Sequence, residues 1–339
     1  MNPSRPRIAV AGAGAVGGYL GGCLALAGAN VRLLGRAALI ETLRTSGDLR
    51  ISDFEGHDRP WRFSPGAWSA DPTVLGEADV ILVTVKSAAT ADMAALIAAH
   101  GAAQAVVVSL QNGVRAAQTL KAALPGRDVR AGVVPFNVAR PEPNHWRRAT
   151  QGAIAVEAGP AALADAFKAD GFQLYEADRI TATQYGKILL NLNNAVNALS
   201  GLPLLAELAD PNWRRVLAAA QTEALAVYRA AGIKPLTAAG APPWLMPHVL
   251  RLPTPLFHGV MARTLKIDAQ ARSSMADDLA QGRPTEIDDL QGEIVRLAQT
   301  AGVDAPVNAR LVALVREQET KGPHAPSPSA AEIRAAVGA

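Results

Sequence analysis

The sequence predicts an α/β protein in which a mostly parallel, doubly wound sheet is followed by an all-α domain. In the first half, short β-branched and apolar runs alternate with small-residue helical stretches, which is the pattern of βαβ units. After residue 178 this alternation ends, and long stretches with helical periodicity follow. A chain of 339 residues is also long enough for two domains that each bury a core.

The first predicted domain, 1–178, contains five clear strand candidates. They lie at Ile8–Ala11, Val31–Leu34, Val80–Val85, Ala105–Leu110 and Val129–Val134. Helices are expected at Ala15–Ala27 and Thr90–Ala99, and further short strands at Leu49–Asp53, Ala153–Glu157 and Phe172–Glu176.

The second half is predicted to be helical. Periodic apolar positions indicate helices over 181–200, 211–231, 256–280, 285–301 and 305–320. A proline-rich stretch, 241–255, lies between two of them. We expect a helical substrate and catalytic domain over 179–321 and a mobile tail over 322–339, because the last residues are rich in Pro, Ser and Ala.

A glycine-rich loop follows the first strand and opens the first helix. In the spacing G-x-G-x-x-G, the first glycine permits a tight turn, the second lets a pyrophosphate approach the backbone, and the third lets helix and strand pack closely. The helix N-terminus stabilises the phosphate charge. We therefore predict a Rossmann-type dinucleotide-binding domain, with a cofactor loop that consists of Gly12, Ala13, Gly14, Ala15, Val16 and Gly17.

The end of the second strand indicates which dinucleotide is bound. An NAD site usually has an acidic residue there, which accepts a hydrogen bond from the ribose 2′-hydroxyl. In "NVRLLGRAAL" the next acid is Glu41, and Arg36 stands where a 2′-phosphate would lie. Arg36 could also be an ordinary surface arginine, but the missing carboxylate favours NADP (NADPH).

Composition excludes several other classes of protein. The net charge is +3, the basic residues form no stripe, and aromatic residues make up only 4%, so no nucleic acid is expected as a partner. A single cysteine, Cys23, excludes an internal disulfide and suits a reducing compartment. Residues 8–29 superficially resemble a signal peptide, but their seven glycines favour a strand, a turn and a helix. We expect a folded cytoplasmic protein without a membrane partner or a metal.

The stretch "YGKILLNLNN", residues 185–194, places polar side chains in an apolar helix. At about 100° per residue, Lys187, Asn191 and Asn194 project from one face. One ammonium and two amides suit a polarised carbonyl with an adjacent carboxylate, and a partly desolvated lysine has a lowered pKa that lets it act as a general acid. The alternative is a helix face that is simply solvated.

Each of several other polar residues can be interpreted either as part of a binding site or as an ordinary structural residue. Pro284 suits a helix start, which would place Glu286 in the first turn, near the positive end of the helix dipole, where a carboxylate is often only a cap. Ser274 ends an apolar stretch twelve residues earlier. Lys86 and Asn112 follow hydrophobic strands, where ligands of open α/β sheets bind, although Asn-Gly is also a common turn.

Taken together, these motifs resemble the ketopantoate reductase family (2-dehydropantoate 2-reductases). The resemblance extends over nearly the whole chain, from "GAGAVG" through "VKS", "LQNGV" and "GKILLNLNNA" to "ARSSMADDLAQGRPTEIDDLQGEI". It is specific because five separate motifs occur in the family's order and spacing.

The resemblance implies a role for each matching residue. It makes Lys187 the proton donor to the substrate carbonyl and Glu286 the residue that positions substrate and lysine near the nicotinamide. Ser274 corresponds to the serine that binds the substrate carboxylate. Asn112 corresponds to the asparagine between nicotinamide and substrate, and Lys86 to the cofactor lysine.

Two positions depart from the family pattern. The family's first helix asparagine is Asn191, but the second is expected eight residues after the lysine, where this chain has Ala195. Asn194 would substitute for it from nearly the same face. A third substrate amide is expected where Leu204 stands, and the stretch 241–255 looks like added material beside the expected cleft. These departures leave open which 2-oxo acid is bound.

The expected activity is NADPH-dependent reduction of ketopantoate or a related 2-oxo acid to the 2-hydroxy acid, with Lys187 as general acid. Two alternatives stay open. One is a β-hydroxyacid dehydrogenase, which also uses a lysine and an asparagine four residues later, and the other is an NADP-sensing protein without catalysis. The expected partners are a small-molecule substrate and, because the helical domain is largely apolar, a second copy of the chain in a homodimer.

Overall fold

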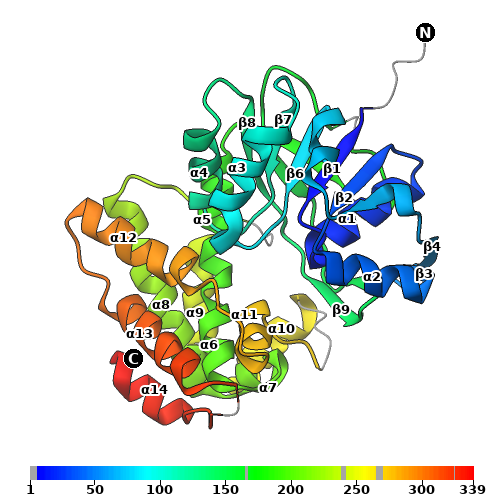
Figure 1. Ribbon diagram of the computed structural model, residues 1–339. Coiled ribbons are helices and arrows are strands. Elements are labelled where there is room, and N and C mark those ends of the chain that lie inside the picture. Colours follow the sequence, from blue (N-terminus) through cyan, green and yellow to red (C-terminus); the bar gives the residue numbers. More distant parts are fainter. Residues whose placement is uncertain (1–5, 165–166, 238–241, 265–269, 324) are drawn as a thin grey trace. The chain divides into compact units, whose positions relative to one another are not determined.

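The structure is a computed structural model that describes residues 6–164, 167–237, 242–264, 270–323 and 325–339. The chain divides into two compact units, 1–181 and 182–339, close to the boundary expected after residue 178. The first unit contains sheets and helices, and the second is helical (Figure 1). The fold class predicted from the sequence is confirmed.

The first unit is built on an eight-stranded sheet. Its strands lie in the order β12 (Leu174–Ala177), β11 (Ile154–Glu157), β8 (Val129–Val133), β7 (Val106–Ser109), β6 (Val80–Val83), β1 (Ile8–Ala11), β2 (Val31–Leu34) and β5 (Trp68–Ser69). All neighbours are parallel except β11 and β8. The α-helices of the unit are α1 (Ala15–Leu26), α2 (Ala37–Ser46), α3 (Thr90–His100) and α4 (Arg115–Ala123), and its 3-10 helices are η1 (Pro65–Ala67), η2 (Pro72–Glu77) and η3 (Ser87–Ala89).

The central strands are apolar because both faces of the sheet are covered. Successive side chains of a strand point to opposite faces. On β1, Val10 belongs to a buried cluster that includes residues of α1, whereas Ala9 belongs to a second cluster that includes Ile97 of α3 and Leu120 of α4. Seven of the eight expected strands lie within two residues of strands of this sheet, and the eighth, Leu49–Asp53, matches a strand of a second sheet.

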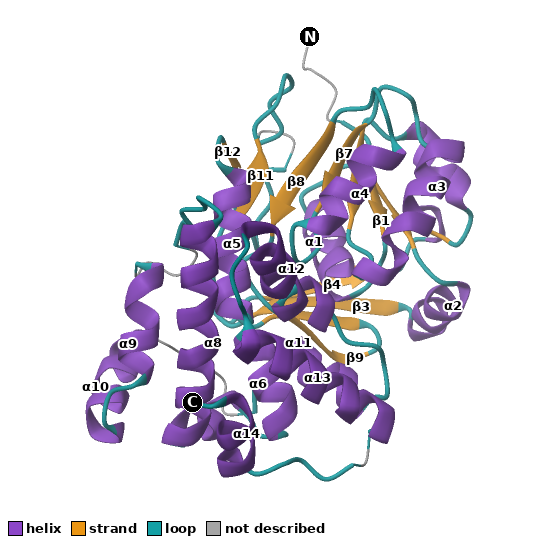
Figure 2. Ribbon diagram, turned by 90° about the vertical axis from the view of Figure 1, so that its left-hand side faces the viewer, coloured by secondary structure: helices purple, strands orange, loops and turns teal. Residues whose placement is uncertain are grey.

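A second, four-stranded sheet is largely unexpected from the sequence. It consists of β4 (Asp58–Arg62), β3 (Asp48–Asp53), β10 (His145–Arg148) and β9 (Val138–Glu142), in that order. Only β3 is among the expected strands, because "DRPWR" in β4 and "VARPE" in β9 contain proline and charged residues that are depleted in strands. The strands of this sheet run in a different direction from those of the larger one (Figure 2).

Glycines allow α1 to pack closely against both sheets. A Cβ atom at Gly21 would come within 2.6 Å of Leu33 in the large sheet, and one at Gly18 within 2.2 Å of Trp146 in the small sheet. A Cβ at Gly22 would overlap Ile51 of β3 in the same way. The glycines of residues 8–29 are therefore packing positions of a folded domain.

The second unit consists of helices around α8. Its α-helices are α5 (Ile180–Asn191, which begins at the boundary), α6 (Asn193–Ser200), α7 (Leu204–Ala209), α8 (Pro211–Ala230), α9 (Met246–Leu250), α10 (Thr254–Thr264), α11 (Ser274–Ala280), α12 (Gln291–Ala301), α13 (Pro306–Lys321) and α14 (Ala330–Val337), with 3-10 helices η4 (Pro243–Leu245) and η5 (Ile287–Asp289). Helix α8 contacts α6, α7, α9, α12, α13 and α14. None of the helices in the described ranges is both long and apolar enough to cross a membrane.

The expected helix over 256–280 is not continuous. Residues 265–269 of that range lie outside the described residues, and residues 271–273 precede α11 without helical structure. The proline-rich stretch forms η4, α9 and the start of α10. The buried guanidinium of Arg214 on α8 donates to the carbonyls of Leu208 and Leu250 and to the hydroxyl of Thr254, and it lies 4.4 Å from the ring centroid of Phe257. One buried arginine thus joins α7, α9 and α10 to α8.

The structure differs from the expectation of a mobile tail over 322–339. Residues 330–337 form α14, which begins with a capping box between Ser329 and Glu332 and buries Ile333 and Val337. Arg334 donates to the side chain of Asn212 on α8 at 3.0 Å. Pro, Ser and Ala are typical of disordered tails, but the capping pair and two apolar side chains four residues apart produce a short amphipathic helix.

Replacement of Ile333 by Ala tests this arrangement. Removing a buried isoleucine costs about 2–5 kcal/mol, and a terminal helix that can adjust should lose an amount near the lower end. We expect a fall of several degrees in the thermal midpoint of the full chain, measured by circular dichroism. Ala336→Ser, an exposed change on the same helix, should leave the midpoint unchanged. Equal midpoints for both variants would mean that α14 does not pack.

Candidate functional site

Four neighbouring strands end in register at one edge of the large sheet, and a predicted cofactor residue follows each of them. The aligned last residues of β1, β2, β6 and β7 are Ala11, Leu34, Val83 and Ser109. The glycine loop follows β1, and Arg36, Lys86 and Asn112 follow β2, β6 and β7. The chain passes from β1 to β2 on one side and returns to β6 on the other, so this edge is the topological switch point at which doubly wound sheets bind ligands.

The glycine loop has the geometry that a dinucleotide requires. Gly12 has φ of +113°, and a Cβ there would lie 2.7 Å from Val85. A Cβ at Gly17 would lie 2.1 Å from the Gly12 carbonyl oxygen, whereas no atom lies within 4 Å of the corresponding position at Gly14. The turn, the close packing and the open space are the three properties expected of these glycines. Gly14 is exposed, Gly12, Ala15 and Val16 are half-buried, and Ala13 and Gly17 are buried.

Arg36 is exposed and directly precedes α2. The backbone N–H groups of Gly12 and Ala13 donate to the carbonyl of Leu34 at 3.1 and 3.0 Å, so the end of β2 is joined to the glycine loop. The structure thus places an arginine beside the loop, at the strand end where an NAD site usually has a carboxylate.

Lys86 and Asn112 lie on loops at the same edge. Lys86 is exposed and precedes η3, and Asn112 is half-buried. Sequence reasoning misses Gln111, a buried side chain that accepts a hydrogen bond from Ser109 and donates to Thr90 at 2.7 Å. Gln111 therefore fixes the loop that presents Asn112. The signal available in the sequence is a polar residue between an apolar strand and the Asn-Gly turn.

Lys187 lies on α5 in the second unit and is half-buried. Burial lowers its pKa from 10.5 to about 8, and the negative charge of Glu286 partly opposes this shift. The structure therefore brings Lys187 and Glu286 within electrostatic reach of each other. A lysine with this pKa is still protonated at neutral pH and can release its proton more readily than a surface lysine.

Buried donors from two other helices hold the backbone around Lys187. The donors are Tyr228 and Gln221 on α8 and Gln291 on α12. They donate to the carbonyls of Tyr185 at 3.2 Å, Leu189 at 3.0 Å and Leu192 at 2.7 Å. The predicted helix over 181–200 is interrupted at Leu192, between α5 and α6, at the carbonyl that Gln291 binds.

A backbone segment packs directly on α5 beside Lys187. The N–H of Leu236 donates to the carbonyl of Ala182 at 2.9 Å. A Cβ at Gly186 would lie 1.7 Å from the carbonyl oxygen of Leu236, so only glycine permits this approach. The packing of Leu236 thus explains why a glycine precedes Lys187, which the sequence pattern does not reveal.

The asparagines after Lys187 differ in exposure from the alanine beside them. Asn191 and Asn194 are half-buried, whereas Ala195 is completely buried. The position eight residues after the lysine therefore faces the interior of the helical unit. Asn194, one residue earlier, is the more accessible of the two neighbouring positions.

Of the two adjacent serines, Ser273 has a structural role and Ser274 is exposed. The hydroxyl of Ser273 caps α11 by accepting from the N–H of Ala276, and it donates to the carbonyl of Asn194 at 3.2 Å. Ser274 is the first residue of α11. The hydrogen bond of Ser273 to Asn194 therefore holds the start of α11, where Ser274 lies, beside α6.

A buried acid supports this junction. The side chain of Asn197 accepts from the N–H of Ser273 at 2.8 Å and donates to Glu207 at 2.6 Å. It also donates to the carbonyl of Leu202, so that Asn197 satisfies a nearby backbone group as well. Burial raises the pKa of Glu207 to about 8, although the amides of Asn197 and Asn193 oppose the shift. Sequence reasoning misses Glu207, because nothing in "LLAELA" shows that its acid is buried.

Glu286 does not lie in the first turn of an α-helix, contrary to the expectation from Pro284. It precedes the 3-10 helix η5, and α12 begins only at Gln291. The reason is Leu290, whose φ and ψ of −110° and −89° are not helical and separate η5 from α12. Glu286 is half-buried, and its effect on Lys187 comes through its charge.

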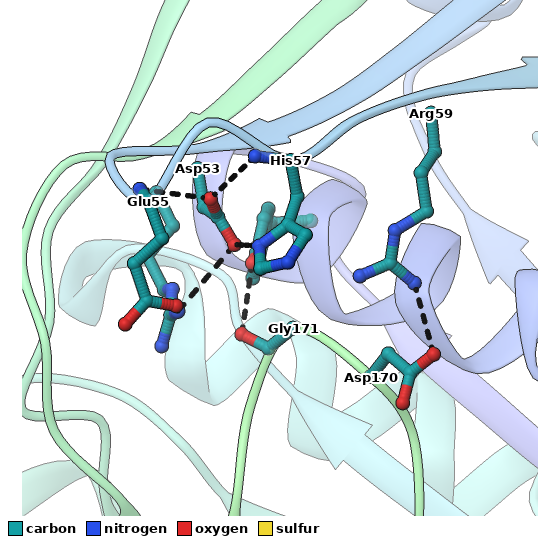
Figure 3. Close-up of polar contacts among 8 residues, drawn as sticks. Asp53, Glu55, His57, Arg59, Asp170 and Gly171 are labelled. Atoms are coloured by element: carbon teal, nitrogen blue, oxygen red, sulfur yellow. Dashed lines mark hydrogen bonds and ion pairs between the residues drawn. The ribbon is translucent and has the colours of Figure 1, made fainter.

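One cluster among the described residues has metal-ligand geometry but is occupied by its own contacts. Ligand atoms of Asp53, Glu55 and His57 lie within 4.8 Å of one another (Figure 3). Asp53 accepts from the N–H groups of Glu55 and His57 and contacts the His57 ring at 2.8 Å. Arg148 lies 3.6 Å from Asp53 and 3.2 Å from Glu55. An ion would have to displace these partners, and the cluster serves to close the turn between β3 and β4.

Comparison with family models identifies both parts of the chain. Residues 8–161 match the model described as ketopantoate reductase PanE/ApbA, and residues 179–319 match its C-terminal counterpart. A 2-dehydropantoate 2-reductase of Halobacterium salinarum is 31% identical over 93% of this chain and 100% of its own length. The enzyme of the same name from Pyrococcus horikoshii is 26% identical over 93% of this chain and 98% of its own.

Solved structures with the same fold include members of this family. A PanE/ApbA family ketopantoate reductase from Ralstonia eutropha matches with a TM-score of 0.77 at 32% identity, covering 93% of this chain and 99% of its own. A D-mandelate dehydrogenase, in a complex with NADH and anilino(oxo)acetate, has a TM-score of 0.74 at 21% identity, covering 93% of this chain and 99% of its own. At that identity the second match shows the fold alone.

The geometry of the glycine loop predicts that one alanine substitution lowers stability and that another weakens dinucleotide binding. Gly17→Ala places a Cβ against the Gly12 carbonyl and should lower the thermal midpoint by several degrees, because overpacking costs about 1–3 kcal/mol. Gly14→Ala meets no protein atom and should leave the midpoint unchanged, while weakening the binding of a dinucleotide measured by fluorescence titration. An unchanged affinity in Gly14→Ala would show that the pyrophosphate does not approach this residue.

Glu207 predicts a pH dependence of stability. Its pKa is raised by burial, so the folded state retains a proton that the unfolded state releases above pH ~4.3. The free energy of unfolding should fall as pH rises from there to about 8, by at most about 1.4 kcal/mol per pH unit. Glu207→Gln removes this slope, which thermal midpoints between pH 5 and pH 8 should show. The exposed control Glu317→Gln should keep the wild-type slope, and equal slopes in both variants would contradict the assignment.

Proposed function

The chain belongs to the ketopantoate reductase family, and we propose that it reduces 2-dehydropantoate, or a closely related 2-oxo acid, with NADPH. The observation that supports this most directly is the half-buried Lys187, with its lowered pKa, under the influence of Glu286. A ketone reductase needs one group that supplies a hydride and another that supplies a proton. Residues suited to the two tasks occur in the first and second units, respectively.

The residues at the edge of the large sheet fit a dinucleotide. Open space at Gly14 and the start of α1 suit a pyrophosphate, and Arg36 suits a ribose 2′-phosphate. When bound, NADPH supplies the hydride that is added to the ketone carbon. Lys86 and Asn112 follow the two strands next to β1 on the other side, and we assign them to the cofactor, with Asn112 also facing the substrate.

Lys187 is assigned as the general acid. Its ammonium stabilises the negative charge that develops on the carbonyl oxygen and then transfers a proton to that oxygen, giving the hydroxyl group of the product. Glu286 keeps Lys187 protonated, because its negative charge raises the lysine pKa against the effect of burial. We also assign Glu286 to the orientation of substrate and lysine beside the nicotinamide.

Asn191, Asn194 and Ser274 are assigned to the substrate. Asn191 lies one helical turn after Lys187, and the contact between Ser273 and Asn194 holds the start of α11 beside α6. The buried Ala195 supports the view that Asn194 replaces the family's second asparagine. Leu204 starts α7 with its side chain half-buried, so an amide expected there is replaced by an apolar group, and a more apolar 2-oxo acid is a natural member of the test panel.

The activity is tested by following NADPH oxidation at 340 nm with ketopantoate, with other 2-oxo acids including aromatic ones, and with NADH in place of NADPH. High kcat/KM for ketopantoate with NADPH is the expected result. Strong activity on a different acid would assign the chain to that substrate. NADPH binding without turnover on any acid would favour a sensor over an enzyme.

The lysine assignment predicts both a loss of turnover and a pH profile. Lys187→Ala should reduce kcat by at least ~10²-fold, the lower end for general acid catalysis, while Lys234→Ala, an exposed lysine of the same unit, should not. In the wild type, kcat/KM for reduction should decrease above about pH 8, where Lys187 loses its proton. Glu286→Gln removes a charge that raises this pKa, so its decrease should begin at lower pH. A profile that stays flat to pH 10 in the wild type would exclude Lys187 as the acid.

A further inference from the structure

Arg140, on strand β9 of the small sheet, is a second arginine beside the glycine loop. Its guanidinium lies over the ring of Trp146, 5.1 Å from the centroid. The indole N–H of Trp146 donates to the carbonyl of Gly14 at 3.0 Å. The indole of Trp146 therefore contacts both the guanidinium of Arg140 and the backbone of Gly14, the second glycine of the loop.

Arg36 reaches the same loop from the large sheet. The N–H groups of Gly12 and Ala13 both bind the carbonyl of Leu34. A Cβ at Gly35 would be 3.2 Å from that of Ala13, so the chain leading to Arg36 lies against the loop. The two arginines thus approach one short loop from two different sheets.

The two positive charges influence each other. Burial lowers the pKa of Arg140, and the charge of Arg36 lowers it further. Among the described residues, neither arginine forms an ion pair with a carboxylate. Arg140 donates to the carbonyl of Pro143, and its Nε is buried without a hydrogen-bond partner. Two neighbouring cations and an unsatisfied buried donor form an arrangement that an anion would stabilise.

We propose that Arg140 and Arg36 together bind the 2′-phosphate of NADPH, so that the small sheet takes part in cofactor selection. This inference rests on the proposed function. The 2′-position of the adenosine ribose lies at the end of the second strand in dinucleotide-binding sheets, which is where Arg36 stands. Two guanidinium groups can share the three oxygens of a phosphate and balance its double charge. The 2′-hydroxyl of NADH offers no such charge.

The test compares dissociation constants for NADPH and NADH in the full chain. Arg140→Met keeps an apolar stem over Trp146 and removes the charge. It should weaken NADPH binding by about tenfold or more, the effect of losing a charge-assisted contact, and change NADH binding less than twofold. Arg147→Met removes an exposed cation from β10 of the same sheet and should change neither constant. The fragment 2′-AMP should lose affinity in Arg140→Met, and 5′-AMP should not.

Each contrary outcome identifies which statement is wrong. If wild type prefers NADPH but Arg140→Met weakens both dinucleotides equally, Arg140 acts only by supporting Trp146 and the loop, and this inference is overturned alone. If wild type binds NADH as tightly as NADPH, the proposed cofactor is wrong and the inference fails with it. Should Arg140→Met fail to fold, Arg140→Lys replaces it, and a reduced but remaining preference for NADPH is then expected.

Discussion

The close approach of α1 to the strands beneath it is the constraint on which the first unit depends. The Cα of Gly17 lies so near the Gly12 carbonyl that a methyl group would not fit between them. This contact holds the start of α1 against the ends of the central strands, and it requires the chain to turn at Gly12 with positive φ. The opposite side of the same helix accepts Trp146 at Gly18. A larger residue at either position would separate a sheet from the helix and move the glycine loop.

In the second unit, burial disfavours the charged forms of two ionisable groups and shifts their pKa values in opposite directions. It lowers the pKa of Lys187 and raises that of Glu207, both to about 8. The residue Lys187 is half-buried. The glutamate is fully buried and binds Asn197, which holds the start of α11. Burial thus lowers the pKa of a lysine on α5 and raises that of an acid at the junction of α6, α7 and α11.

The sequence predicts well those features that depend on local pattern. Buried parallel strands are apolar throughout, so their ends are placed within two residues, and the roles of Gly12, Gly14 and Gly17 follow from their spacing. The small sheet is largely missed because three of its strands, β4, β9 and β10, contain proline or charged residues that are depleted in strands. Helix α14 is missed for a similar reason: its composition is that of a tail, and only the packing of Ile333 and Val337 reveals its place.

Other features of the site depend on contacts between distant residues, which no local pattern shows. Gly186 is required by Leu236, fifty residues later, and the loop of Asn112 depends on the contact between Gln111 and Thr90. The position of Glu286 outside an α-helix depends on the backbone angles of Leu290. The residues that hold the candidate site in place are therefore the ones that the sequence does not reveal.

The hydrogen bonds from Tyr228, Gln221 and Gln291 to carbonyls in α5 and directly after it, at Leu192, have a consequence for how such a protein can diversify. Because these donors come from α8 and α12, rotation of α5 about its own axis would break contacts to two helices at once. The backbone around Lys187 is thereby held by hydrogen bonds that do not involve positions 194, 195 and 204. Exchanges at those positions would therefore leave these three hydrogen bonds, and with them the backbone that carries Lys187, in place.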